Sequence, residues 1–223
     1  MLYDMLSNGF ILYNEDLGII TLKDKAINYV LAKARKIDYD IITIKSAPHS
    51  GNDNIDLKNS NINLKGVFEV PISDTAYVYF RPKDNSMSLQ KDRNMLFDGL
   101  VFAGRMDLMG EKFHFQYAPF TVELNKVDTM RINIPDSGKI DKYGDPVLKP
   151  MKSKVEGIKG LLEIDAPINK SGRTRLPQFP KLYSKEKSYI YYDDSAVAKG
   201  AYGRKNFFFE LEPFRLDSLN NFS

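Results

Sequence analysis

Histidine has the widest catalytic use of any side chain, and the sequence has only two, His49 and His114. His49 lies in a Pro-His-Ser-Gly loop, while His114 alternates with Phe113 and Phe115, which places it on the polar face of an expected strand. Neither has a second histidine at a metal-ligand spacing, and no Gly-x-Ser-x-Gly elbow marks a nucleophilic serine. The sequence has no cysteine, which excludes disulfides, thiolate catalysis and Cys-ligated zinc. We therefore expect no catalytic residue, no metal and no cofactor.

A second candidate is the stretch from residue 170 to residue 187, whose basic residues are interleaved with the aromatic residues Phe179, Tyr183 and Tyr189. Single-stranded nucleic-acid binders use this mixture for phosphate contact and stacking, and Pro177-x-x-Pro180 is a minimal polyproline-II ligand pattern. The alternative, which we favour, is an exposed Lys-rich connector. The candidate ligand or partner contacts here are Lys170, Arg173, Arg175, Lys181, Tyr183, Tyr189 and Tyr191.

The composition is that of a folded protein. The chain has 223 residues, 43% hydrophobic and 27% charged, which excludes disorder and allows one large or two small β domains. A net charge of +3 is too small by itself to indicate nucleic acid or an anionic membrane as the partner. The first residues lack the basic and apolar regions of a signal peptide. No stretch reaches the roughly 20 apolar residues of a transmembrane segment.

Short apolar runs within residues 1–22, separated by Asn14-Glu15-Asp16, predict a hairpin. Residues 23–36 have helical spacing and are the one helix candidate, although a strand from Ile27 to Ile44 is the competing interpretation. Residues 37–46 read as a strand. From residue 55 onward apolar and polar residues alternate, which is the strand signature, with turns expected at 82–85 and 109–112.

An internal repeat is the most informative pattern. Residues 115–123 and 209–217 share the motif Phe-x-[Tyr/Leu]-x-Pro-Phe-x-[Val/Leu]-acid, and each follows a glycine, Gly110 or Gly203. In both copies the apolar residues change from odd to even positions at the Pro-Phe step. Because a β-bulge inserts one residue and keeps the core face inward, the pattern predicts bulges at Pro119 and Pro213. The second copy stops nine residues after Phe214, which predicts that the chain is part of a longer repeat-bearing protein.

These patterns predict a mainly β fold of antiparallel hairpins, forming a sandwich or an open groove, with at most one helix near 23–36. A right-handed parallel β-solenoid is the alternative, since repeats of short strands also mark solenoids. The expected organisation is a β-rich unit at 1–134, a turn-rich connector at 135–154, and a second, incomplete β-unit at 155–223 that repeats the 110–125 motif.

The residues from Gly104 to Tyr117, followed by Phe120-Thr-Val-Glu-Leu and Val127-Asp-Thr-Met-Arg-Ile, resemble stretches of large uncharacterised β-rich envelope proteins of Gram-negative bacteria. More distantly they are similar to the strand–Gly–strand repeats of AsmA/TamB-like proteins. The resemblance spans residues 60–134 and 189–223. It implies an envelope location and a long sheet-like or groove-like scaffold for lipid passage, and it implies no catalytic residues. The polar strand faces carry many Asn, Lys and Glu residues, so the sequence shows no continuous lipid-lined surface.

The leading functional hypothesis is a non-enzymatic structural or binding scaffold, a segment of a longer envelope or surface protein. The expected location is periplasmic, outer-envelope or extracellular rather than cytoplasmic. The partners considered are other segments of the parent protein, a glycan or a lipid, and nucleic acid through residues 170–187 ranks last. The alternative hypothesis is a carbohydrate-binding or carbohydrate-processing β-domain, with stacking surfaces from Tyr77, Tyr79, Tyr189, Tyr191 and Tyr192.

Overall fold

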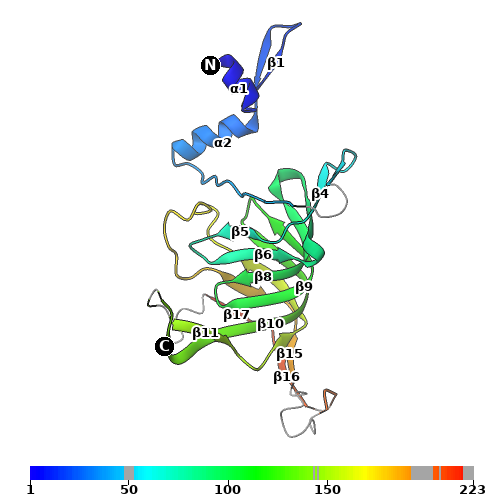
Figure 1. Ribbon diagram of the computed structural model, residues 1–223, viewed down its shortest axis with the longest axis vertical. Helices are drawn as coiled ribbons and strands as arrows, with labels where there is room; N and C mark the ends of the chain where they lie inside the picture. The colour runs from blue at the N-terminus through cyan, green and yellow to red at the C-terminus, as the bar shows by residue number, and fades with distance from the viewer. Residues whose placement is uncertain (48–52, 143, 145, 192–202, 206, 218–223) are drawn as a thin grey trace.

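The computed structural model describes residues 1–47, 53–142, 144, 146–191, 203–205 and 207–217 (Figure 1). Apart from the arm that precedes residue 37, the chain forms one large curved sheet, which stays open rather than closing into a barrel. Every strand pair among the described residues is antiparallel. This confirms the mainly β antiparallel prediction, and the parallel-solenoid alternative is wrong.

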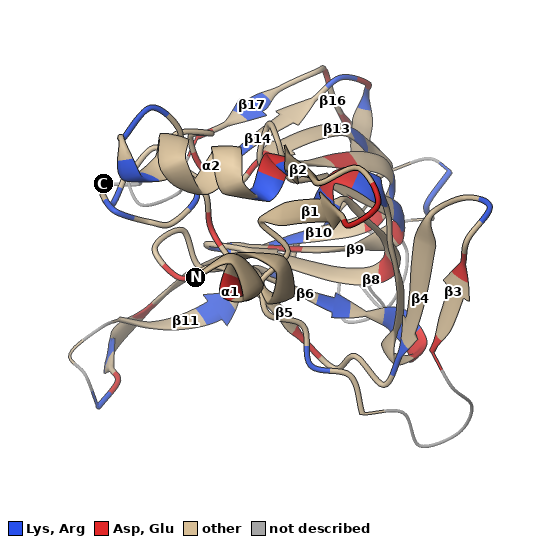
Figure 2. Cartoon of the chain, turned by 90° about the horizontal axis from the view of Figure 1, so that it is seen from above, with Lys and Arg blue, Asp and Glu red and all other residues tan. Residues whose placement is uncertain are grey.

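The first 33 residues form an arm that stands away from the sheet (Figure 1). It consists of α1 (Leu2–Ser7), β1 (Ile11–Asn14), β2 (Ile19–Leu22) and α2 (Asp24–Lys33). The β1–β2 hairpin and the helix near 23–36 were predicted, whereas the short α1, which is followed by Gly9 with a left-handed φ of 68°, was not. Figure 2 looks down on the arm and shows the charges of α2, which has Asp24 in its first turn and Lys33 in its last, as the helix dipole favours.

The strand predicted at 37–46 is wrong. This segment crosses from the arm to the sheet without forming a strand, although Ile42 and Ile44 pack on the core. Its backbone is bound instead by one side chain, because the Tyr117 hydroxyl donates to the Asp40 carbonyl at 2.9 Å and accepts from the Asp40 amide at 2.9 Å. The β-branched residues therefore serve burial against the core rather than pairing with a neighbouring strand.

The sheet is built around four strands that are neighbours in space: β6 (Val78–Pro82), β8 (Met95–Ala103), β9 (Met106–Gln116) and β10 (Thr121–Ile140). Other strands add to both sides of this centre. Beside β6 and β8 lie β5 (Val70–Ser73), β7 (Ser86–Leu89), β4 (Asn61–Lys65) and β3 (Asn54–Asp56), with the short helical turns η1 (Lys83–Asn85) and η2 (Lys91–Arg93). Beyond β10 lie β11 (Pro146–Pro150), β12 (Val155–Glu156), β13 (Ile158–Glu163), β14 (Lys181–Ser184), β15 (Ser188–Tyr191), β16 (Phe208–Leu211) and β17 (Arg215–Leu216).

The core lies on the inner face of the curved sheet and is rich in phenylalanine. Phe80, Phe113, Phe115 and Phe120 are fully buried, and the Phe80 ring contacts the Phe115 ring at 5.7 Å although β8 lies between their strands. Such a contact requires the sheet to curve. Burial of these rings stabilises the fold by about 25 cal/mol per Å² of apolar surface removed from water.

The turn expected at 109–112 is a β-bulge inside β9. The pairs Phe97–Phe113 and Gly99–Gly110 enclose one residue of β8 but two of β9, so the apolar set moves from even to odd positions there. Lys112 has a left-handed φ of 57°, and its amide donates to the Asp98 carboxylate at 2.7 Å. The reversal itself occurs earlier, at the two-residue Gly104-Arg105 turn between β8 and β9.

The bulges predicted at Pro119 and Pro213 are wrong. Pro119 lies in the four-residue turn that joins β9 to β10, where Gln116 pairs with Thr121. Pro213 lies between β16 and β17, which pair with β15 and β14 and not with each other. The two copies of the motif therefore take different structures. Residues 135–154, expected to be a connector, contain the end of β10 and its hairpin partner β11.

Candidate ligand-binding cavity

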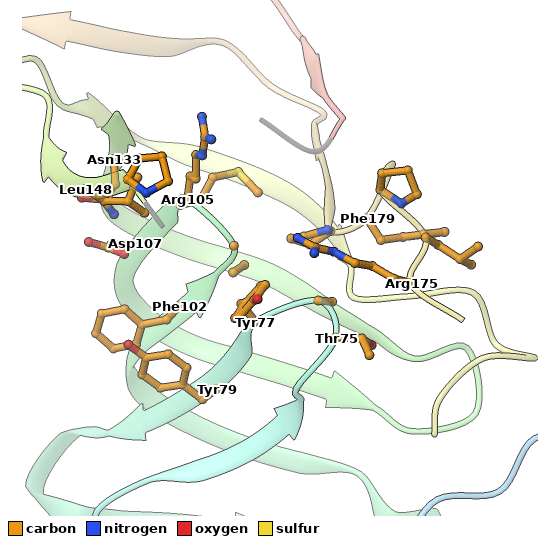
Figure 3. A pocket seen from close by; sticks show the side chains of 18 of the residues that line it. Thr75, Tyr77, Tyr79, Phe102, Arg105, Asp107, Asn133, Leu148, Arg175 and Phe179 are labelled. Atoms are coloured by element: carbon orange, nitrogen blue, oxygen red, sulfur yellow. The ribbon is translucent and has the colours of Figure 1, made fainter. Parts of the chain in front are cut away.

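A cavity of about 810 Å³ opens at one end of the sheet (Figure 3). Its walls come from the β5–β6 turn, the β8–β9 turn, the strands β10 and β11, and the loop at 175–180. These segments are far apart in the sequence, and antiparallel pairing brings their ends together. The lining residues that Figure 3 labels are Thr75, Tyr77, Tyr79, Phe102, Arg105, Asp107, Asn133, Leu148, Arg175 and Phe179.

One wall is aromatic. Tyr79 of β6 pairs with Phe102 of β8, and their rings stack with centroids 4.4 Å apart and planes 13° from parallel. Burial raises the pKa of the Tyr79 hydroxyl, while the guanidinium of Arg81 opposes the shift, so this hydroxyl stays protonated at neutral pH. Tyr77, in the β5–β6 turn, is 59% exposed and has a φ of 53°, which is uncommon for a bulky residue. The wall thus presents apolar ring faces with hydroxyl groups at their edges.

Polar residues lie next to this aromatic wall, and Asp107 pairs directly with Phe102 across β8 and β9. Arg105 and Asp107 lie on either side of Met106, the first residue of β9, and the backbone N–H of Asn133 in β10 donates to the Arg105 carbonyl at 2.8 Å. Arg175 approaches from the loop, with its guanidinium 5.8 Å from the centre of the Tyr77 ring. Figure 3 shows these groups on separate elements around the opening. The cavity therefore combines ring faces with both hydrogen-bond donors and acceptors, the usual composition of a small-ligand site.

The Pro177-x-x-Pro180 pattern forms the outer wall. The cavity is lined here by Leu176, Pro177, Phe179 and Pro180. Pro180 lies so close to Gly104 that a Cβ atom added to Gly104 would be 3.3 Å from the Cδ atom of Pro180. Gly104 has a φ of 60°, so the β8–β9 turn suits glycine both by conformation and by this contact. In this structure the pattern is a packed wall of the cavity.

The seven predicted contact residues fall into different places. Lys170 is 7% exposed, its ammonium donates to the Pro167 carbonyl at 2.7 Å, and burial lowers its pKa. Arg173 is paired with the buried Asp38 at 3.1 Å. Of the seven, only Arg175 lines the cavity.

The other four lie on β14 and β15. The Lys181 ammonium lies 4.4 Å from the centre of the ring of Phe179, a residue that lines the cavity. Tyr183 bonds to Glu163 at 3.3 Å. Tyr189 and Tyr191 contact Phe208, at a smaller cavity of about 410 Å³ beside β12. The stretch is therefore neither one binding surface nor a fully exposed connector.

Sequence reasoning identified Tyr77 and Tyr79 as stacking surfaces, but it missed Phe102, Arg105, Asp107 and Asn133. The signal for the first three was the Gly104-Arg105 turn, since a two-residue hairpin there pairs Phe102 with Asp107. Asn133 could not be placed without the register of β10.

The described residues contain no group of three or more His, Asp or Glu side chains that could hold a metal ion. His114 lies outside the cavity, where its Nδ1 is 3.2 Å from a Glu123 carboxylate oxygen, and His49 lies outside the described residues. Within the same described ranges, no helix is long and apolar enough to cross a membrane. Comparison of the chain with protein-family models, curated proteins and solved structures found no match.

Proposed function

We propose that the chain is a non-enzymatic binding scaffold, a segment of a longer envelope or surface protein, and that the cavity at the end of its sheet holds the ligand. The observation that carries the proposal is the convergence of Tyr77, Tyr79 and Phe102 with Arg105 and Asp107 around one opening. The sheet supplies a rigid frame whose interior is already filled by apolar side chains. Ligand sites are commonly made by loops at the edge of such a frame.

The second proposal is that the ligand is a carbohydrate. A sugar ring has an apolar C–H face that can stack on an aromatic ring, and hydroxyl groups around its edge that both donate and accept hydrogen bonds. The cavity offers exposed ring surface from Tyr77 together with an acid, an amide and two guanidinium groups. The aromatic rings and the polar side chains line the same opening (Figure 3). This favours a glycan over a lipid chain, which would need a continuous apolar lining.

The test is an array of neutral and acidic oligosaccharides, followed by titration of the ones that bind. Tyr77→Gly removes the ring but suits the positive φ of this turn. Loss of one stacked ring, worth about 1.5 kcal/mol, corresponds to about tenfold weaker binding. Tyr3→Ala, which removes a tyrosine that is 80% exposed on α1, is the matched control and should bind like the unaltered chain.

Three results would count against these proposals. Absence of binding across the array would contradict the carbohydrate ligand. Equal affinities for Tyr77→Gly and the unaltered chain would move the ligand away from this cavity. Turnover of a glycan or ester by the purified chain would contradict a non-enzymatic role.

A further inference from the structure

β16 is an edge strand with an unusually apolar surface. It pairs with β15 on one side, and among the described residues no strand pairs with its other side. Phe207, Phe208 and Phe209 are 46%, 47% and 55% exposed. A free edge with exposed apolar side chains is a template for another strand, which native proteins usually block with charge, proline or a covering segment.

One row of side chains explains why this edge is apolar. Met130 pairs with Val155, Val155 with Ile190, and Ile190 with Phe209, so the four side chains lie on the same face of adjacent strands. Met130 and Val155 belong to the buried core, with 1% and 8% exposure, and Ile190 packs against it. The core therefore continues across β12 and β15 and ends, uncovered, at Phe209.

The first copy of the repeated motif shows what a second neighbour does. Phe115, the counterpart of Phe209, lies in β9 between β8 and β10 and is completely buried. Within the described ranges, Phe209 has a neighbouring strand on one side only. Phe115, which also contacts the Phe80 and Phe120 rings, is fully buried, whereas Phe209 is 55% exposed.

We propose that the free edge of β16 pairs with β16 of a second copy of this chain, as an antiparallel two-fold dimer. The strand is self-complementary when the axis passes at Phe209. That register places Phe209 opposite its own copy and Phe207 opposite Leu211, and the core row continues from one chain into the other. A shift by one residue would place the apolar side chains on the opposite face from those of the partner.

The charges of β16 allow the same register. Glu210 lies opposite Phe208 of the other copy and not opposite another glutamate, so like charges are not brought together. Within each chain Glu210 is already paired with Lys187, at 2.5 Å. Two-fold antiparallel pairing is also the arrangement in which one patch can meet itself.

The absence of cysteine from the sequence allows a direct test. At the two-fold axis the two copies of residue 209 would have Cα atoms about 4.5–5.5 Å apart, which is within disulfide range. Phe209→Cys should therefore form a disulfide-linked dimer under mild oxidation, at least about tenfold faster than a cysteine that meets its copy only by collision. Leu57→Cys, at an 86% exposed position in the turn between β3 and β4, is the matched control.

The mass of the unmodified chain in solution completes the test. Sedimentation or light scattering should show a concentration-dependent dimer, and Phe209→Lys should shift it to monomer by placing two ammonium groups face to face. Leu57→Lys should leave the dimer unchanged. Equal disulfide rates for the two cysteine variants, or a dimer that survives Phe209→Lys, would overturn the proposal. A chain that stays monomeric at about 100 µM would also overturn it, because the proposed dimer would then be too weak to matter.

Discussion

Replacement of Asp38 by alanine should be among the most damaging single changes outside the aromatic core. The Asp38 side chain is completely buried, and its carboxylate accepts hydrogen bonds from the Ser171 amide at 2.7 Å and the Ser171 hydroxyl at 2.7 and 2.8 Å. Arg173 adds an ion pair at 3.1 Å. These bonds fasten the segment that leaves the arm to a loop 133 residues further along the chain.

The magnitude follows from the two Ser171 bonds. A hydrogen bond to a charged group contributes about 1.5–3 kcal/mol. The ion pair between Asp38 and the partly exposed Arg173 contributes about 0–1 kcal/mol. Part of this is offset because the variant no longer buries a carboxylate. Burial lowers the pKa of Lys170 and the Asp38 charge partly opposes that shift, so removal of Asp38 leaves this buried ammonium less stabilised. We expect Asp38→Ala to lower the free energy of unfolding by about 3 kcal/mol.

Urea unfolding followed by tyrosine fluorescence and far-UV circular dichroism measures this change, since the chain has 13 tyrosines and no tryptophan. Ser171→Ala, which removes only the hydroxyl, should cost about 1–2 kcal/mol, and its effect should largely disappear when Asp38 is already alanine. Asp16→Ala, at an exposed turn position, should stay within about 0.5 kcal/mol. A loss below about 1 kcal/mol for Asp38→Ala, or additive effects of the two changes, would refute the reasoning.

Two further changes test the sheet and its titration. Gly110→Ala would place a Cβ atom 2.2 Å from the Lys126 carbonyl oxygen, so urea unfolding should show a loss of at least about 2 kcal/mol, and a loss like that of an exposed site would contradict the bulge geometry. Burial raises the pKa of Asp165 above its ordinary 3.8, so the favourable contribution of the protonated form is complete below pH 3.8 and is lost as pH rises through the raised pKa. Asp165→Asn should therefore gain stability relative to the unaltered chain across that pH range, and a difference that does not change with pH would contradict this assignment.

The fold class was predictable because its signals are local. Alternation of apolar and polar residues depends only on the strand backbone, and the 82–85 turn and the β1–β2 hairpin follow from short runs of turn residues. The bulge in β9 was not predictable in the same way. Gly110 and Lys112 are as typical of a turn as of a bulge, and only the partner residues Phe97 and Gly99 distinguish the two.

The cavity was predictable only in part. Tyr77 and Tyr79 lie on one hairpin, so their type and spacing were visible in the sequence. Arg105, Asn133 and Arg175 reach the same opening only through the register of four different strands and a loop, which the sequence does not contain. The strand prediction for residues 37–46 was wrong for a related reason. The apolar residues of this segment are typical of a strand, but the hydroxyl of Tyr117 binds its backbone at Asp40.

β10 has consequences for the order in which the chain can fold. Its 20 residues pair with β9, which precedes it, and with β11, β12 and β13, which follow it. From β8 to β11 each new strand finds its partner next to it in sequence, so these hairpins close small loops and can add in the order of synthesis. The contacts of Asp38 with Ser171 and Arg173 close much longer loops and cannot form before those residues have been made. On a growing chain the segment that follows the arm can bind Tyr117 first, and its contacts with Ser171 and Arg173 should form only much later, long after the segment itself has been made.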